Sequence, residues 1–175
     1  MSEGSEKRML SKRILLLAGL VWLADAMSKV WANRHLTSQV TTVVPNFFYM
    51  VLGKNPGGSV GLGNEWMEVC LTLPAVLVVL IFAWLTKKEK AGIKPTQLQQ
   101  IGFACLTGGT IANWAERVLY HSVTDFCYTT LYDKCIWNLA DLFITGGFAV
   151  VALETFRVAR RHRLQAVQSS QNEQA

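Results

Sequence analysis

The sequence predicts an all-α membrane protein with four transmembrane helices and a small extracytoplasmic β-structure. Hydrophobic residues make up 51% of the 175-residue chain, and they gather in four blocks instead of being spread periodically. Each block is near the ~20 residues that a helix needs to cross the hydrocarbon core of a bilayer. Clusters of Lys and Arg lie directly beside these blocks, as they do beside transmembrane helices.

The four apolar blocks cover approximately residues 14–31, 67–85, 98–120 and 136–156. Basic clusters lie at residues 7–13, 87–94 and 157–163, and the formal net charge is +5. Such clusters also occur in nucleic-acid-binding proteins, but their position beside spanning blocks favours the positive-inside pattern of cytoplasmic loops. We therefore expect a multi-pass membrane protein with both termini in the cytoplasm and no nucleic-acid partner.

Residues 1–163 are expected to form one polytopic membrane domain. The polar residues 164–175 that follow are expected to form a disordered cytoplasmic tail. A cleavable signal peptide is the rival explanation of the first block. It fits poorly, because Asp25 and Lys29 interrupt the block and no clean small-residue cleavage site follows it.

The outer segment, residues 37–63, differs in composition from the helical blocks. Residues 40–44 are almost all β-branched, residues 47–52 are aromatic and aliphatic, and Gly53-Lys-Asn-Pro-Gly-Gly58 follows. This pattern predicts short strands with glycine turns. Such a sheet would lie at the outer membrane surface, where its glycines would let an extended peptide approach closely. A plain surface hairpin explains the pattern equally well.

Two carboxylates mark the outer ends of the last two blocks. Asp125 follows the third block, and Asp141 begins a run that is otherwise apolar as far as Glu154. A carboxylate at that depth is costly without a partner or a function. If the two lie close together, they share a proton near neutral pH and can activate a water molecule, as in aspartic proteases. This chemistry needs no metal and no cofactor. A proton-coupled carrier is the alternative, although no inverted repeat is visible.

Other polar residues interrupt the first and third blocks. Asp25 and Lys29 are four residues apart, so they can pair on one helix face and orient the first helix. Asn113 and Arg117 are also four apart, with Glu116 beside them. We interpret this stripe as a packing and positioning feature, and ligand contact by Asn113 or Arg117 stays open.

The chain contains four cysteines. Cys70 and Cys105 lie inside predicted spans and are expected to be buried apolar residues. Cys127 and Cys135 both lie in the outer loop between the two aspartates. In an oxidising compartment they could form a disulfide that shortens this loop.

Five segments, taken together and in this order, resemble the bacterial lipoprotein signal peptidases (signal peptidase II), which are polytopic aspartic peptidases. The segments are Asp25-Ala-Met-Ser28-Lys29, Phe47-Phe48 with Asn55-Pro-Gly57-Gly-Ser-Val60, Gly108-Gly109-x-x-x-Asn113-x-x-Glu116-Arg117, Val123-Thr-Asp125-Phe126 and Trp137-Asn138-Leu139-Ala140-Asp141. The resemblance covers residues 20–156. It implies a multi-pass protein of the bacterial cytoplasmic (inner) membrane, with four spans and a small β-cradle on the outer side.

The resemblance also implies an activity. The family cuts prolipoproteins before a cysteine that carries diacylglyceryl, near the outer membrane face, and is inhibited by globomycin. Asp125 and Asp141 match its catalytic aspartates, whereas Asp25, Lys29 and Glu116 are assigned structural roles. The expected substrate-binding positions are Asn55, Gly57, Asn113, Arg117, Asn138 and Ala140.

The chain departs from the family pattern at several positions. Glu116 stands where the family has Asp, so we expect altered pairing with Arg117 without loss of activity. Gly58-Ser-Val60 replaces the usual Ala-Ala-Phe, and Trp137 replaces Phe. These departures predict a divergent member with shifted substrate or inhibitor preference. A catalytically inactive, lipoprotein-binding homologue is the alternative, and the presence of both aspartates speaks against it.

Overall fold

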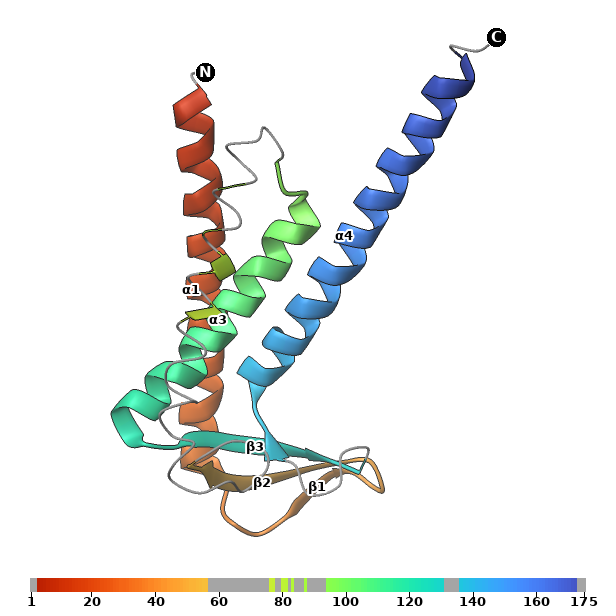
Figure 1. Cartoon of the computed structure of the whole chain (residues 1–175). Helices are drawn as coiled ribbons and strands as arrows, with labels where there is room; N and C mark the ends of the chain where they lie inside the picture. Colours follow the sequence, from red (N-terminus) through yellow and green to blue (C-terminus); the bar gives the residue numbers. More distant parts are fainter. Residues whose placement is uncertain are drawn as a thin grey trace.

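In the described part of the computed structural model, long helices rise from one small sheet (Figure 1). The structure describes residues 3–56, 94–130 and 136–172, together with Val76, Leu77, Leu80, Ile81, Ala83 and Lys87. The helices are α1 (Glu3–His35), α3 (Gln97–Tyr120) and α4 (Leu139–Asn172). The strands are β1 (Thr41–Val44), β2 (Phe48–Asn55), β3 (Val123–Thr129) and β4 (Ile136–Trp137). Both termini lie far from the sheet, and α3 packs against both α1 and α4.

Helices α1 and α4 contain stretches long and apolar enough to cross a membrane, Lys12–His35 and Leu139–Gln165. Their large apolar side chains point outward; Leu16 and Phe148 are each 67% exposed. Within the described residues no other candidate span is found. The predicted third span is a helix, α3, and the predicted span 67–85 lies mostly outside the described residues. Four spans therefore remain a prediction.

Local signals determine where α3 begins and ends. Thr96 and Gln99 form a capping box: the Thr96 hydroxyl accepts the Gln99 N–H at 3.2 Å, and Gln99 Oε1 accepts the Thr96 N–H at 3.0 Å. At the other end His121 adopts the left-handed conformation, with φ 53°. This turn directs the chain out of the helix and into β3, which carries Asp125.

Two consecutive glycines let α3 approach both of its neighbours. A Cβ atom at Gly108 would lie 2.5 Å from the carbonyl oxygen of Ala18 in α1. A Cβ atom at Gly109 would lie 2.7 Å from the carbonyl oxygen of Ala140 in α4. Any larger residue would force the backbones apart, so close packing here brings the first turn of α4 against α3.

The four strands form one antiparallel sheet in the order β1-β2-β3-β4. The strands predicted within residues 37–63 are confirmed in the described part as β1 and β2. Strands β3 and β4 were not predicted, because residues 121–135 were interpreted as a loop and residue 136 as the start of a helix. β3 forms because its β-branched and aromatic residues pair with β2, about 70 residues earlier in the chain. Asp125 therefore lies on an inner strand, opposite Gly53.

Cys127 belongs to the small apolar cluster that joins the sheet to the end of α1. Its thiol is free and buried beside Ala32 and Phe126. Burial, with a smaller effect from the nearby carboxylates of Asp125 and Asp141, raises the pKa of this thiol to about 11. The free thiol does not support the predicted disulfide, and its predicted partner Cys135 lies outside the described residues.

The C-terminal segment also differs from its prediction. Helix α4 continues through residues expected to be disordered and ends at Asn172. The segment after Arg163 contains Leu, Ala and Gln and has neither Gly nor Pro, so nothing in it breaks a helix that is already formed.

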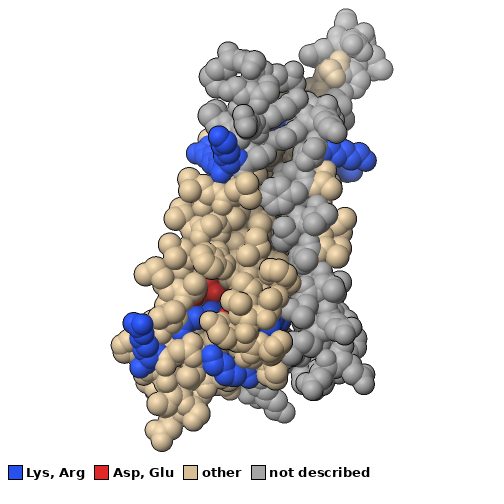
Figure 2. Space-filling view, turned by 90° about the vertical axis from the view of Figure 1, so that its left-hand side faces the viewer, with Lys and Arg blue, Asp and Glu red and all other residues tan. Residues whose placement is uncertain are grey.

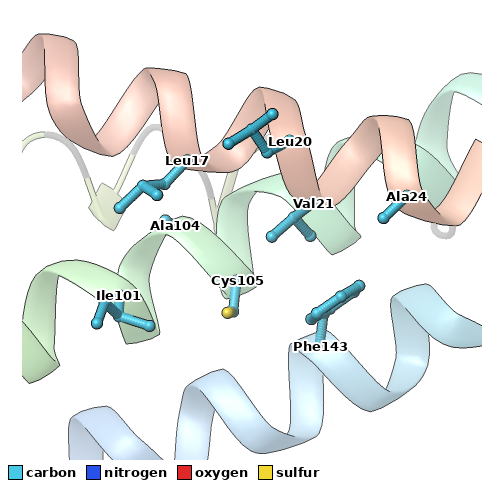
Figure 3. A pocket seen from close by; sticks show the side chains of 8 residues that line it. All are labelled: Leu17, Leu20, Val21, Ala24, Ile101, Ala104, Cys105 and Phe143. Atoms are coloured by element: carbon cyan, nitrogen blue, oxygen red, sulfur yellow. The ribbon is translucent and has the colours of Figure 1, made fainter.

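Helices α1 and α4 diverge as they leave the sheet, and an apolar cavity of about 250 Å³ lies between them against α3 (Figure 3). Its lining consists of Leu17, Leu20, Val21, Ala24, Ile101, Ala104, Cys105 and Phe143. Apart from one thiol, these side chains have no polar atom. The cavity is therefore suited to hydrocarbon and not to water.

Candidate active site

Asp125 lies in the middle of β3 and is held by two side-chain amides. Its carboxylate is almost fully buried, with the residue 4% exposed. Asn138 donates its Nδ2–H to Asp125 Oδ1 at 2.6 Å, and Asn55 donates its Nδ2–H to Oδ2 at 3.2 Å. The strand pairing explains why Asn55 lies near Asp125, because β2 runs beside β3 and ends at Asn55.

Asp141 lies in the first turn of α4 and is oriented by a capping box. The Asn138 N–H donates to Asp141 Oδ2 and the Asp141 N–H donates to Asn138 Oδ1, both at 3.1 Å. Asn113 of α3 donates its Nδ2–H to Asp141 Oδ1 at 2.8 Å. A helix N-terminus stabilises a negative charge, so this position suits an ionised carboxylate.

The structure brings the two aspartates together at Asn138, which is fully buried. The Asn138 side chain binds Asp125, and its backbone N–H binds Asp141. Burial raises the pKa of Asp125 to about 6, and the charge of Asp141 adds to this effect. The amides of Asn138 and Asn55 act in the opposite direction. Asp125 therefore holds a proton at a pH where an ordinary aspartate is ionised.

A buried ion cluster lies behind this pair and is centred on Lys29. The Lys29 ammonium binds Asp25 Oδ2 at 2.8 Å, Glu116 Oε2 at 3.0 Å and Asn113 Oδ1 at 2.8 Å. Asp25 Oδ1 accepts the backbone N–H of Ala140 at 2.8 Å. One ammonium thus joins α1 to α3, and its partner Asp25 joins α1 to α4. The predicted Asp25–Lys29 pair is present in the structure, and it belongs to this larger network.

Lys29 also fixes the orientation of the Asn113 amide. Asn113 Oδ1 accepts hydrogen bonds from Lys29 and, at 3.2 Å, from Asn138 Nδ2. The Asn113 NH₂ group must then point the other way, toward Asp141. A lysine in the first helix therefore determines which group of Asn113 faces the carboxylate.

Glu116 binds Lys29 and Thr124; the expected pairing with Arg117 is not found among the described residues. Its carboxylate accepts the Thr124 N–H at 3.0 Å and the Thr124 hydroxyl, besides the Lys29 ammonium. Arg117 is half-buried, and its Nε has no hydrogen-bond partner within the described part of the chain. That N–H is buried and unsatisfied among the described residues.

The remaining predicted site residues are placed less directly. Ala140 is 0% exposed, so it positions α4 through its backbone and presents no side-chain surface to a ligand. Gly57 and the departures at Gly58, Ser59 and Val60 lie outside the described residues. No group of three or more metal-ligating side chains is found in the described ranges.

Sequence reasoning missed two residues that support the site. Thr124 is fully buried and its hydroxyl accepts a hydrogen bond from Lys54 Nζ at 2.7 Å. Recognition of β3 as a strand would have found Thr124, because neighbours on a strand point to opposite faces. Thr124 then has to face away from Asp125, toward the ion cluster.

The fold is shared with known proteins. Two solved structures, both described as bacterial membrane enzymes, share the fold. The first has a TM-score of 0.71 at 22% identity and covers 82% of this chain and 87% of its own. The second has a TM-score of 0.69, also at 22% identity, and covers 81% and 91%.

The chain belongs to the signal peptidase (SPase) II family, whose model matches residues 17–157. It is similar to the lipoprotein signal peptidase of Beijerinckia indica, with 28% identity over 159 residues, 84% of this chain and 90% of the relative. The lipoprotein signal peptidase of Thermosynechococcus vestitus is 30% identical over 138 residues, 75% of this chain and 83% of the relative. The predicted family is confirmed, and these identities fit a divergent member.

Proposed function

We propose that the protein is an aspartic endopeptidase that removes the signal peptide from diacylglyceryl-modified prolipoproteins, cutting before the lipidated cysteine. Membership of the signal peptidase II family supports the reaction and the substrate class. The observation that carries the aspartic mechanism is the contact of one buried residue, Asn138, with both carboxylates. A homologue that only binds lipoproteins would not need two carboxylates held together in this way.

The surroundings of the two carboxylates support different roles for them in this mechanism. Asp141 lies at a helix N-terminus and accepts two N–H groups, so it is the ionised base. Asp125 carries the proton. Asp141 removes a proton from water, the water oxygen attacks the scissile carbonyl carbon, and Asp125 donates its proton to the carbonyl oxygen. The C–N bond then breaks: Asp141 passes its proton to the leaving nitrogen, and the diol hydroxyl returns one to Asp125.

Substrate contacts are proposed for predicted site residues that lie beside the carboxylates or keep a polar atom unpartnered within the described residues. Asn55 is half-buried beside Asp125, and Arg117 has its unpartnered Nε. Asn113 and Asn138 orient the carboxylates, and Gly57 follows Asn55 closely in the chain. A globomycin-type inhibitor would occupy this region in place of the substrate.

The proposed placement is four spans in the inner membrane, with residues 1–163 as one domain and both termini in the cytoplasm. The apolar stretches of α1 and α4 and their outward-facing Leu and Phe side chains support it. The sheet then lies at the outer face, where the scissile bond of a membrane-anchored substrate is already located. The apolar cavity between α1 and α4 offers room for an acyl chain.

The test is cleavage of a diacylglyceryl-modified prolipoprotein by purified protein in lipid vesicles. Leader release is expected from the wild type and not from Asp125→Asn or Asp141→Asn. The same precursor without diacylglyceryl is the substrate control and should stay uncut. Tight binding without cleavage by the wild type would support the inactive homologue instead, and proton uptake coupled to transport would support the carrier.

A further inference from the structure

A second hollow lies between the sheet-side halves of α1 and α3, separate from the aspartate pair. It has a volume of about 420 Å³ and is lined by one face of α1 from Trp22 to Asn33, one face of α3 from Ala112 to Tyr120, and Lys54 of β2. Figure 2 shows this side of the molecule, with acidic and basic atoms together in a hollow between other side chains, in the half nearest the sheet. The proposed mechanism does not use this groove, which we call the α1–α3 groove.

The ion cluster forms the floor of the α1–α3 groove, and each of its charged groups has partners within the protein. Lys29 has three acceptors, namely Asp25, Glu116 and Asn113. Each carboxylate in turn binds Lys29 and at least one further donor, Ala140 N–H for Asp25 and Thr124 for Glu116. The two carboxylates and one ammonium leave the floor a formal charge of −1, but none of its charged groups lacks a partner.

Lys54 gives the sheet end of the groove its charge. The residue is exposed, and its ammonium donates to Thr124 Oγ1 at 2.7 Å. Among the described residues no carboxylate lies within ion-pair distance of it. Two of its three N–H groups stay available, so this end of the groove attracts an anion.

The walls of the groove are apolar at one end and polar at the other, as a phospholipid molecule is. Trp22 and Asn33 are 11 residues apart, which corresponds to about 16 Å along a helix, or half of the ~30 Å hydrocarbon core. The walls are apolar at Trp22 and Ala112, whereas Lys54 and Asn33 lie at the sheet end. Trp22 and Tyr120 are 43% and 68% exposed, as expected for aromatic residues at a membrane.

We propose that the α1–α3 groove binds an anionic phospholipid of the leaflet on the sheet side, with its phosphate at Lys54 and an acyl chain along the wall that begins at Trp22. Charge selects the lipid at one end and apolar burial holds its chain at the other. The site depends on the proposed membrane placement and not on the peptidase reaction.

The experiment measures quenching of Trp22 fluorescence by phospholipid brominated in its acyl chains, with the full chain in vesicles and no substrate. The chain has six Trp residues, so the signal of Trp22 is obtained by difference against Trp22→Phe. Brominated phosphatidylglycerol is titrated into phosphatidylcholine vesicles, and brominated phosphatidylcholine is the comparison. Lys54→Gln and Lys54→Arg are compared with Arg34→Gln. This control also removes one positive charge at the sheet end of the molecule, from the last turn of α1.

Brominated phosphatidylglycerol should quench Trp22 at a lower mole fraction than phosphatidylcholine does. Lys54→Gln should raise that mole fraction about fivefold, the equivalent of ~1 kcal/mol for one basic group at an anionic surface. Lys54→Arg and Arg34→Gln should stay close to wild type. Equal quenching by both lipids, or equal losses for Lys54→Gln and Arg34→Gln, would overturn the proposal. Displacement by excess inorganic phosphate would show a site for free phosphate and would also overturn it.

Discussion

Two pairs of carboxylates, each with one buried and one half-buried member, lie on either side of Asn113, and they have different kinds of partner. Asp25 and Glu116 share the ammonium of Lys29. Asp125 and Asp141 are held by amide groups of asparagines. An ammonium cancels negative charge, whereas a neutral amide only orients it. We therefore expect the first pair to be structural and the second pair to keep a proton that it can transfer.

The largest effect is expected at the second pair. Asp125→Asn or Asp141→Asn keeps the shape of the side chain but removes the acid or the base, so leader release should fall by about 10²–10⁴-fold or more. Initial cleavage rates of a diacylglyceryl prolipoprotein measure this effect. Glu154→Gln, a buried acid elsewhere on α4, is the control and should keep its rate. Full activity in either aspartate variant would show that the second pair, like the first, is not required for cleavage.

Loss of the cation between the carboxylates of the first pair should lower the stability of the protein. Lys29→Met leaves the carboxylates of Asp25 and Glu116 buried without their cation, at a cost of about 3–5 kcal/mol in the free energy of unfolding. Thermal or denaturant unfolding of the purified protein in detergent measures this change. The double variant Lys29→Met with Glu116→Gln removes one of the stranded charges and should recover part of the loss. If Lys29→Met were as stable as the wild type, the cluster would not have the structural role assigned to it.

The pH dependence should come from the second pair. Because the folded-state pKa of Asp125 is raised to about 6, its proton is lost as the pH rises through that value. We expect kcat/KM to fall about tenfold per pH unit above it. The stabilisation by the protonated form is fully present below the unfolded-state pKa of about 3.9, and it is lost as the pH rises through about 6. Unfolding of Asp125→Asn should lack this pH-dependent component, whereas Lys29→Arg should keep it.

The smallest effect concerns the departure at Glu116. Glu116→Asp restores the family residue but shortens the reach by one methylene, so it should weaken the bonds to Thr124 or Lys29. We expect a loss of about 1 kcal/mol in unfolding free energy and a cleavage rate within a few-fold of wild type. The matched variant Glu116→Gln keeps the reach and loses the charge. A larger loss for Glu116→Asp than for Glu116→Gln would mean that reach matters more than charge.

Much of the site could be predicted from local sequence. Asp125, Asp141 and the asparagines lie in short segments that resemble family motifs, and Gly108 and Gly109 mark the close packing of α3. The features that could not be predicted depend on contacts between residues far apart in the chain. Strand β3 is recognisable only beside β2, and the bond from Lys29 to Asn113 joins residues 84 positions apart. The role of Lys54 likewise depends on Thr124, which is 70 positions away.

The coupling of Asp125 to Asp141 can be measured directly by ¹³C NMR of protein labelled at the aspartate carboxyl groups. The chain has only four aspartates, and Asp125→Asn identifies the signal of interest. We predict that Asp125 titrates near pH 6 and that Asp141→Asn, which removes the neighbouring charge, shifts this titration to lower pH. An Asp125 signal that titrates like an ordinary aspartate and ignores Asp141→Asn would contradict a shared proton.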